Sequence, residues 1–187
     1  MAQEIELKLA FPPAAHKSLL QHPLIAGAAN AERTQTLINT YFDTPGLDLR
    51  RARIAVRTRK AGARWLQTVK CASSSEGGLS SRPEWEQPYR NERFDFSAID
   101  HAETRQFLER NADRILPVFT TEFRRETRVV EPEPGVRILL MIDSGRISAN
   151  DRESPISELE LELACGNPVH LLDFALRLAA DLPLLPE

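Results

Sequence analysis

The sequence predicts an α+β fold, in which an eight-stranded antiparallel β-barrel with a polar lumen is flanked by helices. Segments of strand character follow one another through short turns, which is typical of an antiparallel sheet. Charged residues recur at every second position of these segments, so each strand would have one charged and one apolar face. Three segments with helical spacing of apolar residues could cover the apolar face. Closing the sheet would protect long strands that show no clear edge.

The first half of the chain contains four predicted strands and one short helix. Alternation, or many β-branched and aromatic residues, predicts strands over residues 4–9, 33–44, 54–59 and 65–70. The last two strands flank a loop whose Gly62 indicates a hairpin turn. Pro12 and Pro13 indicate the first turn of a helix that ends before Pro23.

The second half begins with a segment rich in Gly and Ser, residues 73–81, which predicts a loop. The strand expected after it contains Pro83 and Pro88, and these prolines indicate an edge strand or a bulge. Apolar spacing predicts a helix over residues 101–116 and a terminal helix that begins at Pro168. The predicted strands of this half are residues 82–89, 119–130, 136–148 and 157–164.

Composition limits the class of protein. The chain has 187 residues, of which 42% are hydrophobic and 27% charged, so we expect one globular domain over residues 1–187. No apolar stretch approaches the ~20 residues of a membrane helix, and the N-terminus does not resemble a secretory signal. We therefore expect a cytoplasmic protein without membrane contact. A net charge of −3 argues against nucleic acid as a partner.

The charged strand faces carry both signs. Their acidic residues are Glu4, Glu6, Glu84, Glu86, Asp143, Glu158, Glu160 and Glu162, and their basic residues are Lys8, Arg57, Arg59, Lys70 and Arg125. A single charged face most often meets water. Recurrence on five or more strands instead favours an enclosed lumen, in which the two signs must offset one another. Carboxylates bind Mg²⁺ or Mn²⁺, and guanidinium and ammonium groups bind phosphate oxygens, so the ligand inferred is a polyphosphate with divalent metal.

Six short motifs occur in one order along nearly the whole chain. They are ExExK at residues 4–8, YFDTP at 41–45 followed by VRTR at 56–59, TxK at 68–70, RxExE at 82–86, DxGxI at 143–147 and ExExE at 158–162. Together they resemble the CYTH, or triphosphate tunnel metalloenzyme, superfamily. The resemblance implies an eight-stranded tunnel that binds a small-molecule triphosphate together with Mg²⁺ or Mn²⁺.

The resemblance also implies roles for individual residues. Triphosphate would be bound by Lys8, Arg57, Arg59, Lys70, Arg82 and Arg125. Metal would be bound by Glu4, Glu6, Asp143, Glu158, Glu160 and Glu162. The catalytic set would be Glu4, Glu6, Lys8, Glu84 and Glu86, with the last two positioning basic residues.

One position departs from the family pattern. The family often has two basic residues, two positions apart, on the sixth strand, and here Phe123 occupies one of them. The other is Arg125 if the strand register is as we expect, because its neighbour Arg124 would then face the opposite side.

The resemblance predicts an inorganic triphosphatase that splits tripolyphosphate into pyrophosphate and phosphate. Such hydrolysis needs cations on the transferred phosphoryl group and a positioned water, and the chain contains no GxxxxGK, GxSxG or HExxH motif for another mechanism. Thiamine triphosphatase or another organic triphosphatase, class IV adenylate cyclase and a non-catalytic polyphosphate-binding module remain open. An aromatic content of 6% disfavours base stacking. We also expect that the chain is truncated from a longer protein with a C-terminal CHAD domain.

Overall fold

The computed structural model describes residues 2–71, 75–76, 79–90 and 92–186, and of residues 2–4, 75–76 and 79–82 it describes the backbone. The long strands are β1 (Ala2–Ala10), β3 (Gln35–Asp43), β4 (Ile54–Ala61), β5 (Arg64–Cys71), β7 (Leu79–Pro88), β8 (Leu116–Val130), β9 (Arg137–Ala149) and β10 (Arg152–Cys165). Three two-residue strands are β2 (Ala29–Asn30), β6 (Ser75–Glu76) and β11 (Leu185–Pro186). The predicted α+β fold with an antiparallel sheet and helices is confirmed.

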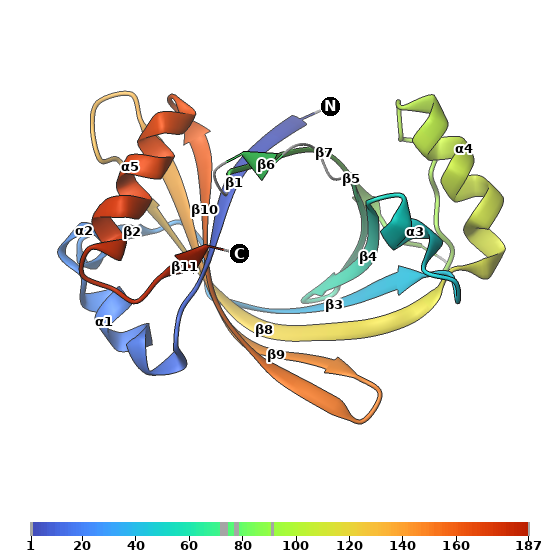
Figure 1. The fold of residues 1–187 in the computed structure, drawn as a ribbon, viewed down its shortest axis with the longest axis horizontal. Helices are drawn as coiled ribbons and strands as arrows, with labels where there is room; N and C mark the ends of the chain where they lie inside the picture. The colour runs from blue at the N-terminus through green and yellow to red at the C-terminus, as the bar shows by residue number, and fades with distance from the viewer. Residues whose placement is uncertain (1, 72–74, 77–78, 91, 187) are drawn as a thin grey trace.

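The long strands pair in the order β10, β9, β8, β3, β4, β5 and β7, and every pairing is antiparallel. β1 pairs with the strands at both ends of this path. Its Glu6 lies opposite Glu162 of β10 and opposite Ser80 of β7. Figure 1 shows the resulting sheet as a strongly curved surface. The curvature gives the sheet an inner face and an outer face, and alternation assigns successive residues of each strand to opposite faces.

Helices cover the outer face. The helical elements are η1 (Pro13–Ala15), α1 (His16–Gln21), α2 (Pro23–Ala26), α3 (Asp48–Arg51), α4 (Ala102–Asn111), η2 (Ala112–Arg114) and α5 (Pro168–Ala179). One apolar cluster joins α5 and α1 to β1, β9 and β10, and includes the fully buried Leu159, Leu161 and Leu171. A second cluster joins α4 to β4 and β5 around Leu108 and Val69. Figure 1 shows one group at the left and the other at the right of the curved sheet, both outside its concave face. Each buried leucine contributes about 1.5–3 kcal/mol, so apolar burial fixes which face points outward.

Two predictions about the middle of the chain need correction. Part of the expected loop at residues 73–81 is strand, because β6 and the start of β7 lie within it; residues 72–74 and 77–78 are outside the described chain. β7 is not simply an edge strand, since residues 79–84 pair with β1 and residues 84–88 pair with β5. Pro83 lies in the half of β7 that pairs with β1, and Pro88 lies in the half that pairs with β5. Each half therefore forms a long ladder with only one of these two strands. No described helix has the length and apolar character needed to cross a membrane.

Gly145 explains the glycine of the DxGxI motif. It lies on β9 opposite Phe123 of β8. A Cβ atom at this position would lie 2.1 Å from the carbonyl oxygen of Glu122 and 2.5 Å from the Cα of Phe123. Only a residue without a side chain fits such a close approach of two backbones.

We predict that Gly145→Ala destabilises the protein by about 1–3 kcal/mol or more, because the methyl group forces β8 and β9 apart. Urea unfolding followed by circular dichroism would measure the change. Gly27→Ala is the matched control, since a Cβ there meets no atom within 4 Å and its φ is −87°. Equal stability of the two variants would contradict the packing assigned to Gly145.

Candidate active site

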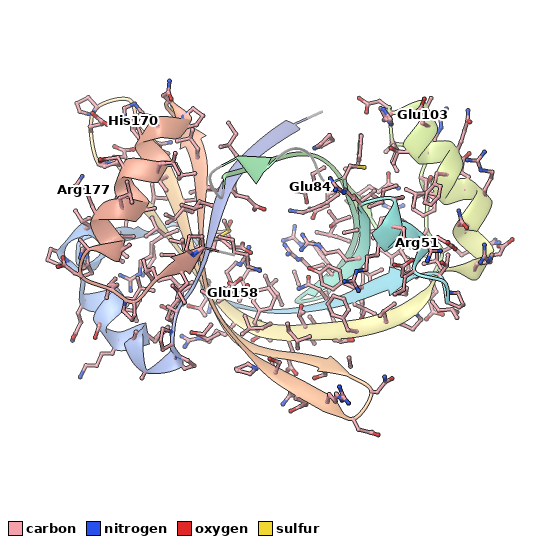
Figure 2. The ribbon with its side chains drawn as sticks, viewed as in Figure 1. Arg51, Glu84, Glu103, Glu158, His170 and Arg177 are labelled. Carbon is pink, nitrogen blue, oxygen red and sulfur yellow. The ribbon has the colours of Figure 1, made fainter. Side chains whose placement is uncertain are left out.

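The inner face gathers the charged residues of seven strands. Cross-strand pairs place Lys8 opposite Glu160, Arg125 opposite Asp143 and Lys70 opposite Glu84. Most of these side chains are largely withdrawn from solvent, with 13% exposure for Arg125 and 15% for Lys70, whereas Lys8 is 36% exposed. Figure 2 labels Glu84 and Glu158, which come from opposite sides of the curved sheet. The arrangement is stable only because opposite charges pair, since an unpaired buried ion is strongly destabilising.

Arg125 is at the centre of this network. Its Nε donates to Oδ1 of Asp143 at 2.8 Å, and its Nη2 donates to Oδ2 of Asp143 at 2.6 Å and to Oε2 of Glu160 at 2.5 Å. The guanidinium group also lies 5.4 Å from the ring centre of Phe123, a favourable cation–π distance. Phe123, at the position where the family often has a second basic residue, therefore packs its ring against the guanidinium group of Arg125.

Burial and neighbouring charges shift the pKa values of this network in opposite directions. Burial raises the pKa of Asp143 more than Arg125 lowers it. Burial also acts to raise the pKa of Glu160, but the charges of Arg125, Lys8, Lys70 and Arg57 outweigh it and lower that pKa. For Arg125, burial is outweighed by the two carboxylates, and the pKa is raised. Glu160 is thus held as an anion and Arg125 as a cation at neutral pH.

Three carboxylates of the inner face form a compact cluster. Asp143, Glu158 and Glu160 each offer an oxygen, and these oxygens lie within 4.8 Å of one another. Oε2 of Glu158 is 2.6 Å from Nζ of Lys8. Oxygen donors in this number suit hard cations such as Mg²⁺ or Mn²⁺, which use a few carboxylates and complete their coordination with water or substrate. The donor set therefore fits the expected metals.

The opposite side of the inner face is rich in cations. Nζ of Lys70 lies 2.9 Å from Glu84, and Nη2 of Arg57 lies 3.9 Å from the same carboxylate. Nε of Arg57 is buried and has no hydrogen-bond partner in the described part of the chain. Burial, together with the charges of Arg57 and Arg125, lowers the pKa of Arg59 to about 10, so Arg59 remains charged at neutral pH. Such mutually repelling cations are stabilised by an anionic ligand.

Asn39 and Thr121 contribute to the site, although the sequence did not single them out. Asn39 is 1% exposed, accepts a hydrogen bond from Nε of Arg59 at 2.8 Å and donates to Oγ1 of Thr121 at 2.8 Å. It therefore fixes one edge of the Arg59 guanidinium. A signal was present: Asn is rare inside strands, and residue 39 has the same strand parity as Asp43.

The structure brings only some of the predicted site residues together. Arg125 faces inward and Arg124 is 63% exposed on the other face, as the predicted register requires. Glu6 and Glu162 lie opposite each other on β1 and β10, outside the three-carboxylate cluster. Glu86 is exposed and accepts a hydrogen bond from the Thr68 hydroxyl at 3.2 Å. The side chains of Glu4 and Arg82 lie outside the described part of the chain; their backbones pair with each other across β1 and β7.

The sequence was compared with known protein families. The CYTH domain family matches residues 2–184. The chain belongs to the CYTH family. The resemblance carried by the six motifs is thereby confirmed.

Among curated CYTH relatives, an inorganic triphosphatase from Haemophilus influenzae is 33% identical over 177 residues. The match covers 93% of this chain and 49% of the relative, so the chain spans about half the length of that protein.

Solved structures share the fold at low identity. A candidate adenylyl cyclase from Hippeastrum, described as having a dominant triphosphatase activity, has a TM-score of 0.64 at 20% identity, covering 98% of this chain and 90% of its own. A candidate adenylate cyclase from Bacillus halodurans has a TM-score of 0.64 at 18% identity, with coverage of 100% and 95%. The Mimivirus capping enzyme triphosphatase has a TM-score of 0.53 at 10% identity, with coverage of 95% and 89%.

We predict that Arg125→Gln lowers the free energy of unfolding by about 3–5 kcal/mol at neutral pH, because Asp143 and Glu160 lose their shared cation. Without that cation the pKa of these carboxyls rises in the folded state, so the folded protein binds protons more readily and the deficit shrinks as the pH falls. Urea unfolding at several pH values would measure it.

Arg124→Gln is the control, since its exposed side chain should change stability by no more than about 0.5 kcal/mol. A loss in the Arg125 variant no larger than that of the control, or a deficit independent of pH, would contradict the central position given to Arg125.

Proposed function

We propose that this protein hydrolyses inorganic triphosphate to pyrophosphate and phosphate, using Mg²⁺ or Mn²⁺. The observation that carries this proposal is the inner face of the curved sheet, on which the cluster of Asp143, Glu158 and Glu160 lies beside Arg125 and Lys8. In a triphosphate with a bound divalent metal, the positive metal can bind the carboxylates and the negative phosphates can bind the basic side chains. The name of the Haemophilus influenzae relative supports the same activity.

We infer that the eight long strands close into a barrel and that its lumen is the substrate tunnel. The support is the double pairing of β1, which joins β10 to β7. With the apolar side chains packed under helices, the alternate positions can only face the enclosed space. A closed sheet also excludes bulk water, which strengthens every interaction between the charges inside.

Asp143, Glu158 and Glu160 would hold the metal, with Glu4, Glu6 and Glu162 on the neighbouring strand positions as further ligands. A divalent metal at this cluster would offset negative charge on the phosphates and orient their oxygens. The remaining work falls to the side chains of the chain itself.

Binding would exchange ionic partners inside the tunnel. Lys8 and Arg125 now pair with the carboxylates that would receive metal, so each can turn to a phosphate oxygen when the metal replaces it. Arg57, Arg59, Lys70 and Arg82 would bind further phosphate oxygens, and Glu84 would orient Lys70 and Arg57. The ligand thus takes over pairing that the protein supplies internally, which limits the desolvation cost of binding.

Hydrolysis would need one positioned water molecule. Its oxygen attacks a terminal phosphorus, the bond from that phosphorus to the bridging oxygen breaks, and pyrophosphate leaves with the electron pair. Glu4 or Glu6 would accept the proton of the water, Lys8 would offset charge on the transferred phosphoryl group, and Glu86 would support the strand through Thr68. A module that only bound polyphosphate would need the cations and not the acidic cluster.

We predict that Glu160→Gln and Lys70→Gln each lower kcat/KM for tripolyphosphate by about 100-fold or more, because each removes a buried charge placed at the reacting phosphates. Phosphate release in the presence of Mg²⁺ or Mn²⁺ is the measurement, and chelation of the metal should abolish it.

Lys17→Gln is the control for the loss of one side-chain charge, since Lys17 is exposed on α1. Normal folding and unchanged release in all three variants would contradict the site. Tripolyphosphate that binds tightly but is never cleaved would establish the binding module instead.

A further inference from the structure

Three hydrogen-bonded side chains cross the inner face from β4 to β8. Nε of Arg59 donates to Oδ1 of Asn39 at 2.8 Å, and Nδ2 of Asn39 donates to Oγ1 of Thr121 at 2.8 Å. The three residues lie directly opposite one another, because β3 pairs with β4 on one side and with β8 on the other (Figure 1). Thr121 is 7% exposed and Asn39 is fully buried. These three side chains are called the Arg59–Asn39–Thr121 relay below.

The arginine sets the direction of both hydrogen bonds. A guanidinium nitrogen can only donate, so Nε of Arg59 must meet the carbonyl oxygen of the Asn39 amide. The amide nitrogen therefore faces Thr121 and donates one N–H to its hydroxyl oxygen. Because that oxygen already accepts a hydrogen bond, the hydroxyl proton is left to donate, and no residue in the described part of the chain accepts it. Thr121 is thus prepared as a donor.

Thr121 lies in an apolar part of the inner face of β8. Alternation places on this face Phe119, Thr121, Phe123 and Arg125. Phe123 packs with Leu37 in a small apolar cluster. Aromatic rings of phenylalanine offer no hydrogen-bond donor to a phosphate oxygen, so the donor between Phe119 and Phe123 is the hydroxyl of Thr121.

A neutral donor suits this part of the site. Burial, together with the charges of Arg57 and Arg125, lowers the pKa of Arg59, because these cations already repel one another. A further cation on β8 would increase that repulsion before any ligand binds, whereas a hydroxyl group does not. Asn39 takes up only Nε of Arg59, and no described residue accepts a hydrogen bond from its Nη groups.

We propose that the Thr121 hydroxyl donates a hydrogen bond to a phosphate oxygen of the triphosphate, and that Asn39 is the positioning residue that prepares both Thr121 and Arg59 for phosphate contact. One amide joins the two ends of the relay, so both ends can bind oxygens of the same phosphate chain. The inference rests on the proposed function, since it assigns two further residues to the same substrate. A hydrogen bond to a phosphate oxygen that does not react contributes to binding and leaves the chemical step unchanged.

Thr121→Val removes the hydroxyl and keeps a branched side chain of the same shape. It should raise the KM for tripolyphosphate about five- to tenfold, as expected for one lost hydrogen bond, while kcat stays within about twofold. Thr121→Ser retains the hydroxyl and should restore the KM to within about twofold of the wild type. Steady-state phosphate release with Mg²⁺ or Mn²⁺ is the measurement.

Thr120→Val is the matched control. Thr120 is the neighbouring residue of β8, so it lies on the opposite face of the sheet, where it pairs with Ser148 of β9. Its substitution should leave the KM unchanged, and circular dichroism should show the same fold in all variants. An unchanged KM in Thr121→Val, or an equal rise in Thr120→Val, overturns the inference, while phosphate release by the wild type leaves the proposed function standing.

A double substitution tests the positioning role of Asn39. Asn39→Asp replaces the amide donor with a second acceptor, so the Thr121 hydroxyl must donate to the carboxylate instead of the ligand. The KM should rise, and adding Thr121→Val should then change it by no more than about twofold, because the donor is already lost in that background. If Thr121→Val keeps its full effect in the Asn39→Asp background, the two residues act independently and the positioning role is wrong.

A binding measurement separates this inference from the proposed hydrolysis. The probe is imidotriphosphate, in which NH groups replace the bridging oxygens, titrated in the presence of Mg²⁺ by calorimetry. If the wild type hydrolyses no triphosphate, but Thr121→Val weakens binding of this probe and Thr120→Val does not, the Thr121 contact stands and the proposed hydrolysis fails. Equal affinity of the wild type and Thr121→Val for the probe shows that Thr121 does not contact the phosphates.

Discussion

The pairing of Arg125 with Asp143 and Glu160 is the interaction on which the rest of the structure depends. It allows three charged groups to lie close together on the inner face of the curved sheet, and Lys8 with Glu158 extends the same compensation to β1. Without such pairing, burial of these carboxylates would destabilise the fold by more than the surrounding apolar contacts stabilise it. The outer face is held by ordinary packing under α5 and α4, and this packing forces the charged positions inward.

This ionic balance also accounts for the chemistry proposed here. A network of charges that pair with flexible side chains can exchange those partners for a ligand of mixed charge. The excess of cations near Arg57 and Arg59 favours an anion, while Asp143, Glu158 and Glu160 favour a divalent metal. Stability of the empty protein and affinity for the ligand are therefore two consequences of one arrangement.

Much of this arrangement can be predicted from the sequence because strand alternation has a period of two. Once Leu7 and Leu159 are assigned to an apolar core, Glu6, Lys8, Glu158 and Glu160 must share the other face. The choice of Arg125 over Arg124 follows from the same parity. The periodicity also places the long helices correctly, since each buries one apolar stripe.

Other features depend on tertiary contacts that no short segment reveals. α3 is too short to show a period. It is held by Asp43, which precedes it in the chain and whose carboxylate accepts hydrogen bonds from the backbone N–H groups of Leu49 and Arg50. The stacked pair of Tyr41 and Phe119 joins residues far apart in sequence, so a low total aromatic content concealed a concentrated aromatic surface. The hydrogen bond from Asn39 to Thr121 likewise depends on the pairing of β3 with β8, which places the two residues side by side.

Anomalous diffraction from crystals grown with Mn²⁺ and a non-hydrolysable triphosphate would test the central claim most directly. The account predicts a manganese peak within about 2.2 Å of a carboxylate oxygen of Asp143, Glu158 or Glu160, with Arg125 or Lys8 turned toward a phosphate oxygen. Manganese found only on the outer face, with the bonds of Arg125 to Asp143 and Glu160 unchanged and no phosphate on the inner face, would contradict it.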